Sequence, residues 1–475
     1  MHIKKKTKII ATIGPSCFSY ERIKKMIIAG VNVCRLNFSH ISHEDASRII
    51  SIIRKINNEI DTKTAILGDL QGPKIRLGNV KKNTTLKSGE KINLTNQYRE
   101  SCDKILYIDY NKLTSDLKFN DIVLIDDGKI KLRVNKITKD IITCDIINGG
   151  KVHSKKGVNF PNTELTFQST TKKDKADLNF LIKNNVDWVA LSFVRTSKDI
   201  TSIREFLNKK KSDIKIIAKI EKPEAVKNIK SITRSSDGIM IARGDLGIEI
   251  PMQKVPIVQK KIIKLCLNYS KPVVVATQLM EGMINNSLTT RAETNDVANA
   301  VFDGADALML SGETAVGKYP VKVVRAMTKI ILSVELSSIN LRSKLILPQK
   351  KANERYISDS ICFYASELVD QVQSKAIITL THSGYNAQKI ASNRPNAFIY
   401  VFTHNKKILS SLSLFWGIYV FYYDKFNSTD DTISDLHAFL KKKRILKSGQ
   451  IVLNIGSMPI REKGMTNMLK VGKIK

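Results

Sequence analysis

The sequence predicts an α/β protein: a (β/α)8 TIM barrel with an inserted small all-β lid domain and a C-terminal α/β domain. Two observations predict the barrel. Short apolar runs rich in Ile and Val alternate with polar stretches of helical periodicity, which is typical of parallel strands covered by helices. Eight such runs precede residue 341, and eight is the number of strands that closes this barrel. They are Lys8–Ile13, Val31–Phe38, Thr64–Leu70, Trp188–Phe193, Ile214–Ile220, Gly238–Arg243, Pro272–Gln278 and Ala307–Ser311.

The third run is not followed directly by a helix. After Pro73 the chain changes to short alternating segments, such as 121–126 and 140–147, interrupted by the turn pairs Asp127-Gly128 and Gly149-Gly150. This pattern indicates an all-β insertion. Helical periodicity resumes near Thr171, a residue type that caps helix starts. We therefore assign residues 73–165 to the insertion and residues 1–72 and 166–340 to the barrel.

A third unit, residues 341–475, again alternates strands and helices. Its expected strands are Lys375–Thr381, Ala397–Thr403, Ile418–Tyr423 and Gln450–Ile455. The order of elements indicates a smaller α/β domain.

Composition excludes several classes of protein. The 475 residues are 42% hydrophobic and 26% charged, which is ordinary for a folded protein. No stretch reaches the roughly 18 apolar residues that span a bilayer, and residues 1–14 are interpreted as a first strand, not a signal peptide. The six cysteines form no CxxC pair, so zinc and disulfide frameworks are not indicated and a reducing cytoplasm fits best.

The net charge of +34 admits a basic nucleic-acid-binding protein as an alternative. The lysines are spread thinly, and no basic stripe interleaved with aromatic residues accompanies them. Enrichment in Ile, Asn and Lys together favours compositional drift at exposed positions. No specific nucleic-acid partner is therefore predicted.

Charged or hydroxyl residues end nearly every predicted barrel strand. In a barrel of this kind, reacting groups come from the carboxyl ends of the strands, and packing alone does not require such residues there. The set comprises Arg35 to His40, Asp69, Ser192, Lys219, Glu221, Arg243 to Asp245, Thr277, Gln278, Ser311 and Glu313.

The residue types at these ends suit a phosphorylated acid. Two carboxylates on adjacent strand ends, Glu221 and Asp245, suit Mg²⁺, which takes few protein ligands and keeps open positions. Lys219 lies two residues before Glu221, so both side chains leave a strand on the same side, and an ammonium there can stabilise a transferring phosphoryl group. Arg35 can grip phosphate with two nitrogens, and Gly244 lets a backbone N–H approach a ligand. These residues alone leave phosphoryl transfer and enolate chemistry both open.

At these residues the sequence resembles the pyruvate kinase family. The most specific match is the run Asp237–Pro251. Further matching stretches cover the barrel and the insertion, and the last domain matches more loosely. They are Thr7–Ile9, Thr12–Pro15, Arg35–His40, Gly72–Arg76, Lys156–Asn159, Ala218–Glu221, Ala276–Gln278, Thr290–Glu293 and Met309–Glu313.

The resemblance implies Mg²⁺-dependent transfer of phosphate from phosphoenolpyruvate to ADP, giving pyruvate and ATP, by a cytoplasmic homotetramer. Its site residues follow by motif. The resemblance gives Glu221 and Asp245 as Mg²⁺ ligands, and Ser311 and Glu313 as members of a proton relay with Thr277. The residues that bind phosphoenolpyruvate are Arg35, Lys219, Gly244, Asp245 and Thr277, of which Lys219, Arg35 and Thr277 are catalytic. The residues toward the nucleotide are Asn37, Phe38, Ser39, His40, Arg76 and Lys156. The insertion is then expected to close over the barrel mouth as a lid.

One departure from the family pattern concerns K⁺. Many members carry Asp-Thr-Lys-Gly-Pro-Glu where this chain has Asp69–Lys74, and that form goes with a K⁺ held beside residues matching Asn37, Ser39 and Asp69. Here Leu70, Gln71 and Lys74 differ. A fixed ammonium can supply the positive charge that K⁺ brings, so K⁺ is predicted to be dispensable.

The segment Thr381, His382, Ser383, Gly384 and Asn386 lies between a predicted strand and a helix, where hydroxyls and helix-start amides suit a phosphate. Relatives bind phosphorylated allosteric effectors in this region, and a plain helix cap explains the same residues nearly as well.

A Mg²⁺-dependent barrel lyase acting on an enolate is the alternative enzyme hypothesis. It leaves the insertion, Lys219 and the third domain unexplained.

Overall fold

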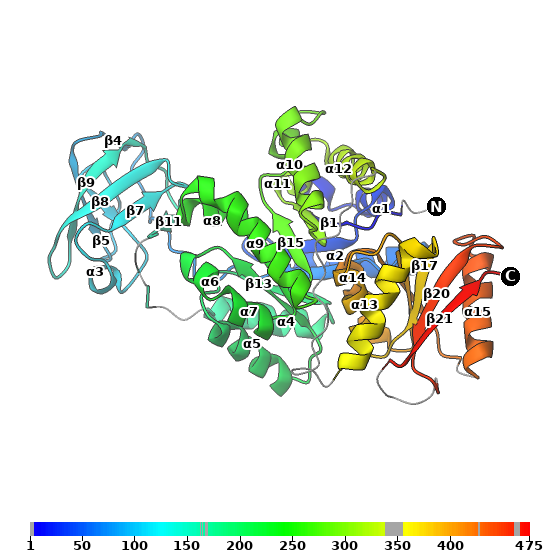
Figure 1. The fold of residues 1–475 in the computed structure, drawn as a ribbon. Coiled ribbons are helices and arrows are strands. Elements are labelled where there is room, and N and C mark those ends of the chain that lie inside the picture. Colours follow the sequence, from blue (N-terminus) through cyan, green and yellow to red (C-terminus); the bar gives the residue numbers. More distant parts are fainter. Residues whose placement is uncertain are drawn as a thin grey trace.

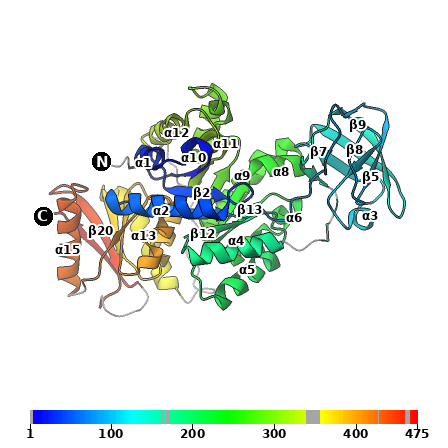
Figure 2. The same ribbon diagram turned by 180° about the vertical axis from the view of Figure 1, so that it is seen from behind.

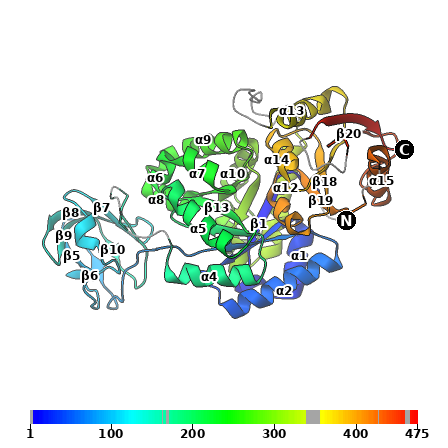
Figure 3. The same ribbon diagram turned by 90° about the horizontal axis from the view of Figure 1, so that it is seen from below.

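The structure is a computed structural model that describes residues 4–161, 163, 165, 166, 170–337, 355–425, 428–459 and 466–475. The boundary predicted between residues 340 and 341 lies outside the described residues. Three units follow one another in space, with the barrel between the insertion and the C-terminal domain in every view (Figures 1, 2 and 3).

Eight parallel strands close into a barrel, in the order β1, β2, β3, β12, β13, β14, β15, β16 and back to β1. All eight predicted strands are confirmed, each within two residues of its expected ends. Their bounds are β1 Lys8–Thr12, β2 Val33–Asn37, β3 Ala65–Asp69, β12 Trp188–Leu191, β13 Lys215–Ile220, β14 Gly238–Ala242, β15 Val273–Ala276 and β16 Ala307–Leu310.

Alternation along the strands builds two layers of core. Ile10, Val33 and Leu67 belong to one cluster, and their neighbours Ile9 and Cys34 belong to another that includes the surrounding helices. Successive side chains of a strand point to opposite faces, so a buried strand must be apolar on both. The described helices around the barrel are α1 Tyr20–Ala29, α2 His43–Glu59, α4 Lys172–Lys183, α5 Ser197–Lys209, α6 Pro223–Lys227, α7 Ile229–Ser235, α8 Arg243–Glu249, α9 Val255–Asn268, α10 Arg291–Phe302, α11 Gly312–Ala315 and α12 Pro320–Glu335.

The helix start expected at Thr171 is confirmed. Thr171 caps α4: its hydroxyl accepts a hydrogen bond from the Asp174 backbone, and the Asp174 carboxylate accepts one from the Thr171 N–H. This reciprocal pair satisfies two donors that a helix start leaves free. Asp174 also accepts a hydrogen bond from Gly72 N at 3.0 Å, so the cap ties the two chain segments on either side of the insertion together.

The insertion carries its own sheets and its own apolar core. A six-stranded sheet has the order β11-β7-β8-β9-β5-β6, and a two-stranded sheet pairs β10 with β4. Two strands expected from the sequence correspond to β7 and β9. The elements are β4 Thr85–Leu86, β5 Lys91–Thr95, β6 Ile105–Tyr107, α3 Leu113–Asp116, β7 Ile122–Ile125, β8 Ile130–Ile137, β9 Ile142–Asn148, β10 Gly150–Lys151 and β11 Val158–Asn159.

The C-terminal domain is a five-stranded sheet in the order β19-β18-β17-β20-β21, with β21 antiparallel to β20. The four expected strands are confirmed, and the edge strand β21 is an addition. The elements are α13 Tyr356–Gln371, β17 Ala376–Leu380, α14 Tyr385–Ser392, β18 Phe398–Thr403, β19 Ile418–Tyr422, α15 Thr429–Lys442, β20 Ile451–Gly456 and β21 Met468–Lys473.

The C-terminal domain packs on the end of the barrel where the strands begin. Lys8 Nζ donates to Ile418 O at 2.7 Å, and Trp188 Nε1 donates to Ser411 O at 3.1 Å. Asp306, just before β16, accepts from Arg394 Nη2 at 2.8 Å and from Trp416 N at 3.0 Å. The carboxyl ends of the strands are therefore left facing the insertion. No helix in the described part of the chain is long and apolar enough to cross a membrane.

Candidate active site

Arg35 and Asp69 stand at the ends of the neighbouring strands β2 and β3. Arg35 Nε lies 2.7 Å from Asp69 Oδ2, and Arg35 Nη1 donates to Thr12 Oγ1 at 2.8 Å. Arg35 is 8% exposed and Asp69 is 1% exposed. Asp69 pairs with Lys219 as well as with Arg35, so its buried carboxylate keeps its charge. The same carboxylate holds the Arg35 guanidinium beside the barrel mouth.

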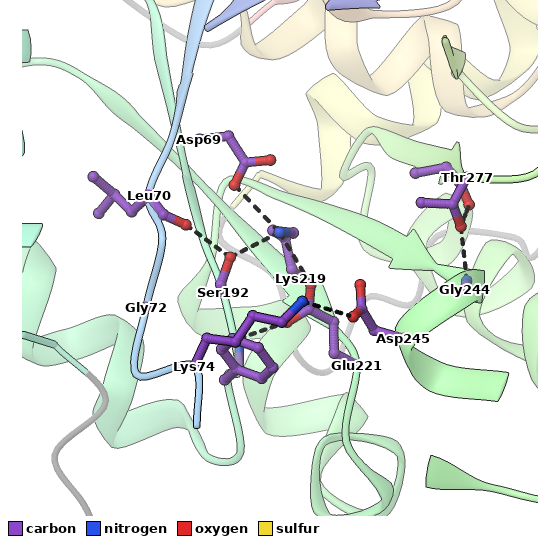
Figure 4. Close-up of polar contacts among 12 residues, drawn as sticks. Asp69, Leu70, Gly72, Lys74, Ser192, Lys219, Glu221, Gly244, Asp245 and Thr277 are labelled. Atoms are coloured by element: carbon purple, nitrogen blue, oxygen red, sulfur yellow. Dashed lines mark hydrogen bonds and ion pairs between the residues drawn. The ribbon is translucent and has the colours of Figure 1, made fainter. Parts of the chain in front are cut away.

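Lys219 lies at the centre of a buried cluster (Figure 4). Its Nζ is 2.7 Å from Ser192 Oγ, 3.0 Å from Glu221 Oε1 and 3.2 Å from Asp69 Oδ1. Burial alone lowers the pKa of a lysine, but the carboxylates of Asp69 and Glu221 outweigh it and raise the pKa of Lys219 above its usual value. The ammonium therefore stays protonated at neutral pH.

Ser192 was noted in the sequence only as a strand-end hydroxyl and was not assigned to the site. Its Oγ donates to Leu70 O at 2.8 Å and accepts from Lys219. The hydroxyl therefore holds the ammonium against the segment that follows β3. Leu70 is expected in the monovalent-cation region, and its side chain is buried. Its backbone carbonyl, which accepts from Ser192, is therefore its polar group in that region.

The two predicted Mg²⁺ ligands flank the same cluster. Glu221 follows β13 and is buried, and its Oε2 accepts from Phe193 N at 2.7 Å. Burial raises the pKa of Glu221, and Lys219 opposes the rise. Asp245 lies in the first turn of α8, partly exposed, with Lys74 Nζ 4.0 Å from its Oδ1.

This donor set fits Mg²⁺. The described residues contain no group of three or more His, Cys, Asp and Glu side chains that would hold a metal on its own. Two carboxylates, of which Asp245 lines a cavity and Glu221 is buried, suit a cation that prefers oxygen and completes its coordination with water and phosphate. They do not suit zinc, for which sulfur and nitrogen ligands would be expected.

Thr277 and Gly244 meet across the ends of β15 and β14. Gly244 N donates to Thr277 Oγ1 at 2.7 Å, so this backbone N–H is already engaged by Thr277. Thr277 and Gln278 have positive φ values of 70° and 53°, a strained conformation for residues with a β-carbon. Strain of this kind is retained where surrounding contacts impose it.

Arg243 contacts the carbonyls of both strained residues, and sequence reasoning missed its partner Asp296. The guanidinium pairs with both Asp296 carboxylate oxygens at 2.7 Å and donates to Thr277 O at 2.8 Å. Asp296 lies inside α10, away from any strand end. A search confined to strand ends therefore could not find it.

Glu313 is buried beside Ser311 at the end of β16. Its Oε2 accepts from Ser311 N at 2.7 Å and its Oε1 accepts from Met280 N at 3.3 Å. Burial raises the pKa of Glu313. The side chain thus ties together the loops after β15 and β16, and both it and Ser311 line the same cavity as Thr277.

The residues expected near the nucleotide are spread over the barrel and the insertion. Asn37 Oδ1 accepts from Ser39 N at 3.2 Å, and the side chain of Phe38 is 1% exposed in the core. Burial lowers the pKa of His40, and nearby Arg76, Arg35 and Lys74 lower it further. In the insertion, Arg76 Nη1 donates to Lys155 O at 2.9 Å, and Lys156 Nζ pairs with Asp126 at 2.8 Å.

A cavity of about 1150 Å³ is lined by part of this set, and Arg35, Lys219 and Glu221 are not among its lining residues. Its lining includes Gly244, Asp245, Thr277, Ser311 and Glu313 from the barrel. Lys74, Leu124, Asp127 and Gly128 line it from the insertion. Residues of both units therefore face one space that is large enough for two small ligands.

The candidate effector segment forms the turn between β17 and α14. Gly384 is the helix cap with φ 85°, and its N–H donates to Thr381 Oγ1 at 2.9 Å. His382 Nδ1 lies 3.1 Å from His404 Nε2. Ser383 Oγ accepts a 3.4 Å bond from Tyr385 N, and Asn386 donates to Thr466. The hydroxyls of Thr381 and Ser383 thus bond within the turn, and His382 and Asn386 contact residues outside it.

Comparison with known proteins agrees with this geometry. The family model "Pyruvate kinase, barrel domain" matches residues 4–324, and "Pyruvate kinase, alpha/beta domain" matches residues 359–472. Pyruvate kinases of Staphylococcus aureus strains MRSA252 and USA300 are each 39% identical over 470 residues, 98% of this chain and 80% of theirs. A crystal structure of a pyruvate kinase from Cryptosporidium parvum superposes with a TM-score of 0.91 at 33% identity, covering 99% of this chain and 96% of that one. The chain is therefore an enzyme, a phosphotransferase, and belongs to the pyruvate kinase family.

Proposed function

We propose that this enzyme transfers the phosphoryl group of phosphoenolpyruvate to ADP with Mg²⁺, giving pyruvate and ATP in the last step of glycolysis, and that it needs no K⁺. The observation that carries the proposal is the protonated, buried Lys219 held by Asp69, Ser192 and Glu221 at the barrel mouth. A fixed ammonium in a site shielded from water is suited to stabilising phosphoryl charge.

Phosphoenolpyruvate would lie against five residues: Arg35, Lys219, Gly244, Asp245 and Thr277. Arg35 offers nitrogens to the phosphate. The turn at Gly244 and Asp245, with Thr277, would receive the carboxylate. Glu221 and Asp245 would hold Mg²⁺, which supplies positive charge to the phosphate oxygens. The strained backbone at Thr277 supports this role because it fixes a hydroxyl at the cavity wall.

In the reaction, an ADP phosphate oxygen forms a bond to phosphorus as the bond from phosphorus to the enol oxygen breaks. Lys219 and Arg35 would stabilise the negative charge spread over the phosphoryl oxygens. The nucleotide would lie toward Asn37, Phe38, Ser39, His40, Arg76 and Lys156. With its side chain buried, Phe38 would contribute through its backbone.

The enolate left behind gains a proton at its methylene carbon. Thr277, with Ser311 and Glu313 through water, is the proposed relay. Supporting this, Glu313 is fixed by two backbone N–H groups, and burial raises the pKa of its carboxyl. A raised pKa favours a carboxyl that can exchange protons near neutral pH.

The insertion, residues 73–165, is proposed to act as a lid on the barrel mouth. When closed, it would exclude water that could intercept the phosphoryl group. The cavity lined from both units supports this role. Asn159, at the end of β11, donates to Glu249 of α8 at 2.7 Å. The helix that carries Gly244 and Asp245 therefore contacts the proposed lid directly.

Lys74 would take the place of K⁺ beside Asn37, Ser39, Asp69 and Leu70. Its Nζ lies 4.0 Å from Asp245 Oδ1, at the cavity wall. A covalently attached charge has no dissociation equilibrium. We further propose a cytoplasmic homotetramer, with the turn at Thr381–Asn386 as the site of a phosphorylated effector.

The test is an assay of pyruvate and ATP from phosphoenolpyruvate and ADP. It is run with Mg²⁺ in K⁺-free buffer, then with K⁺ added, and without Mg²⁺ as the control. Similar rates with and without K⁺ are expected. Activity only with K⁺ would refute the role of Lys74 and keep the reaction. No activity in any buffer from folded protein, with phosphorylated effectors added, would refute the reaction itself.

A further inference from the structure

A second cavity, of about 260 Å³, lies between the barrel and the C-terminal domain. Its lining residues place it at the strand-start end of the barrel, opposite the cavity that Thr277 and Asp245 line. Figure 1 shows the C-terminal domain packed beside the barrel. The barrel wall consists of Trp188, Lys215, Asp237 and Lys271. The C-terminal domain contributes Arg355, Ser383, Tyr385, Gln388, Ile408, Ser411, Leu412 and Phe415.

Positive charge is in excess around this cavity. Three of its lining residues, Lys215, Lys271 and Arg355, are cations, and Asp237 is the single anion among them. Asp237 is already engaged, because its Oδ2 pairs with Arg204 and accepts from Ile216 N at 2.8 Å. Asp237 is therefore shared with Arg204 and offsets the charge of Lys271 only in part.

Lys271 shows the imbalance most clearly. Within the described ranges, its Nζ makes no hydrogen bond or ion pair, and neither does that of Lys215. Burial lowers the pKa of Lys271; Asp237 raises it, and Arg204 and Lys215 lower it again. A partly buried ammonium without a partner is costly, and an anion from outside the chain would remove that cost.

Apolar side chains from both domains also line the cavity. Trp188 is 1% exposed, and Leu412 and Phe415 are also buried. The indole N–H of Trp188 is already bonded to Ser411 O, so its ring offers carbon surface. Gln388 and Ser383 of the C-terminal domain add polar groups to the lining. Such a lining suits a ligand with an anionic end and a small apolar body.

We infer that this interdomain cavity binds a small organic anion, a phosphate monoester or a carboxylate, with its charge on Lys215 and Lys271 and its apolar body against Trp188 and Phe415. The site differs from the turn at Thr381 in position and composition, although Ser383 belongs to both. Because its walls come from two domains, its occupant would bridge the starts of β13 and β15 to α14.

Tryptophan fluorescence gives a local readout. The chain has two tryptophans, Trp188 in the cavity wall and Trp416 beside Arg394, 5.1 Å from its guanidinium. Both lie at this interface and neither lines the catalytic cavity. We would titrate the full chain with phenyl phosphate, exciting at the red edge of tryptophan absorption, and confirm the affinity by calorimetry. Benzoate and inorganic phosphate as further probes distinguish the charged group from the apolar body.

Phenyl phosphate should change the emission saturably and bind more tightly than inorganic phosphate. Lys215→Met and Lys271→Met should each weaken binding about tenfold, as expected for losing one charge-assisted contact. Lys264→Met, which removes an exposed charge from α9, is the matched control and should bind normally. Lys219→Met and Thr381→Val should also retain the fluorescence response, because they alter other candidate sites.

Lys271→Met should not lower the melting temperature, since it removes an unpaired ammonium; should it fail to fold, Lys215→Met decides. The inference is overturned if the wild type gives no response, if the cavity variants bind like the wild type, or if Lys264→Met weakens binding equally. Loss of the response in Lys219→Met or Thr381→Val would also overturn it, by assigning the binding to those sites.

Discussion

Replacing Lys74 by glutamate is expected to make the enzyme dependent on K⁺. Lys74 Nζ lies 4.0 Å from Asp245 Oδ1, and the two side chains are 34% and 32% exposed. Opposite charges at that distance attract by about 1 kcal/mol in bulk water and by about 4 kcal/mol at a protein surface. With this exposure, about 1–2 kcal/mol is reasonable.

Reversing the charge replaces this attraction by a repulsion of similar size, a change of about 2–4 kcal/mol. If the ammonium acts on the transition state, kcat/KM without K⁺ should fall by about 30- to 900-fold. Added K⁺ should restore most of it. Lys74→Met should lose about half of that free energy, a fall of about 5- to 30-fold.

The assay measures initial rates over a K⁺ series, with Na⁺ or a large organic cation holding ionic strength constant. Lys198→Glu, an exposed charge reversal on α5, is the control for net charge and should behave like the wild type. The reasoning is refuted if Lys74→Glu keeps full activity without K⁺. It is equally refuted if the wild type already requires K⁺.

Three further predictions concern buried charges. Lys219→Met should lower kcat by about 10²–10³ or more, as expected for loss of a preorganised stabiliser, and near-normal turnover would remove Lys219 from its proposed role. Glu249→Gln removes the buried ion-pair partner of Lys222, whose side chain is 8% exposed. The unfolding free energy should fall by about 3–5 kcal/mol, and adding Lys222→Met should restore part of it. Burial lowers the pKa of Lys8 to about 7, against about 10.4 when unfolded. The unfolded chain therefore binds more protons between these values, and the wild-type unfolding free energy should rise with pH by up to about 1.4 kcal/mol per unit. Denaturant unfolding at pH 7 and pH 9 should show a smaller rise in Lys8→Met, and an equal rise would contradict the buried, neutral lysine.

The barrel could be predicted because its strands are buried on both faces. A strand such as Val273–Ala276 must be apolar throughout, so it stands out from its polar surroundings. The strands of the insertion were harder to find, because short elements such as Thr85–Leu86 and Gly150–Lys151 carry almost no periodicity. Strand β21 was missed for a related reason, since it lies at a sheet edge and all six of its residues, including Lys470, are only partly buried or exposed.

Strand ends predicted which groups gather at the barrel mouth, but not how they pair. Arg35 and Asp69 are 34 residues apart in sequence, and Asp69 and Lys219 are 150 apart. Sequence spacing cannot show that Asp69 contacts both cations. Asp296 was missed outright, because it acts from inside a helix by fixing Arg243.

These pairings explain how a buried lysine can serve this chemistry. In an apolar site Lys219 would lose its proton, and its electrostatic role would be lost with it. Two carboxylates prevent this, and one of them, Glu221, is also a proposed Mg²⁺ ligand. Any cation that binds Glu221 would weaken the ion pair between Glu221 and Lys219. Asp69 would then be the principal counter-charge of Lys219. The ammonium would then be freer to turn toward an incoming phosphate. The Asp69 carboxylate, which also pairs with Arg35, would still hold both cations at the barrel mouth.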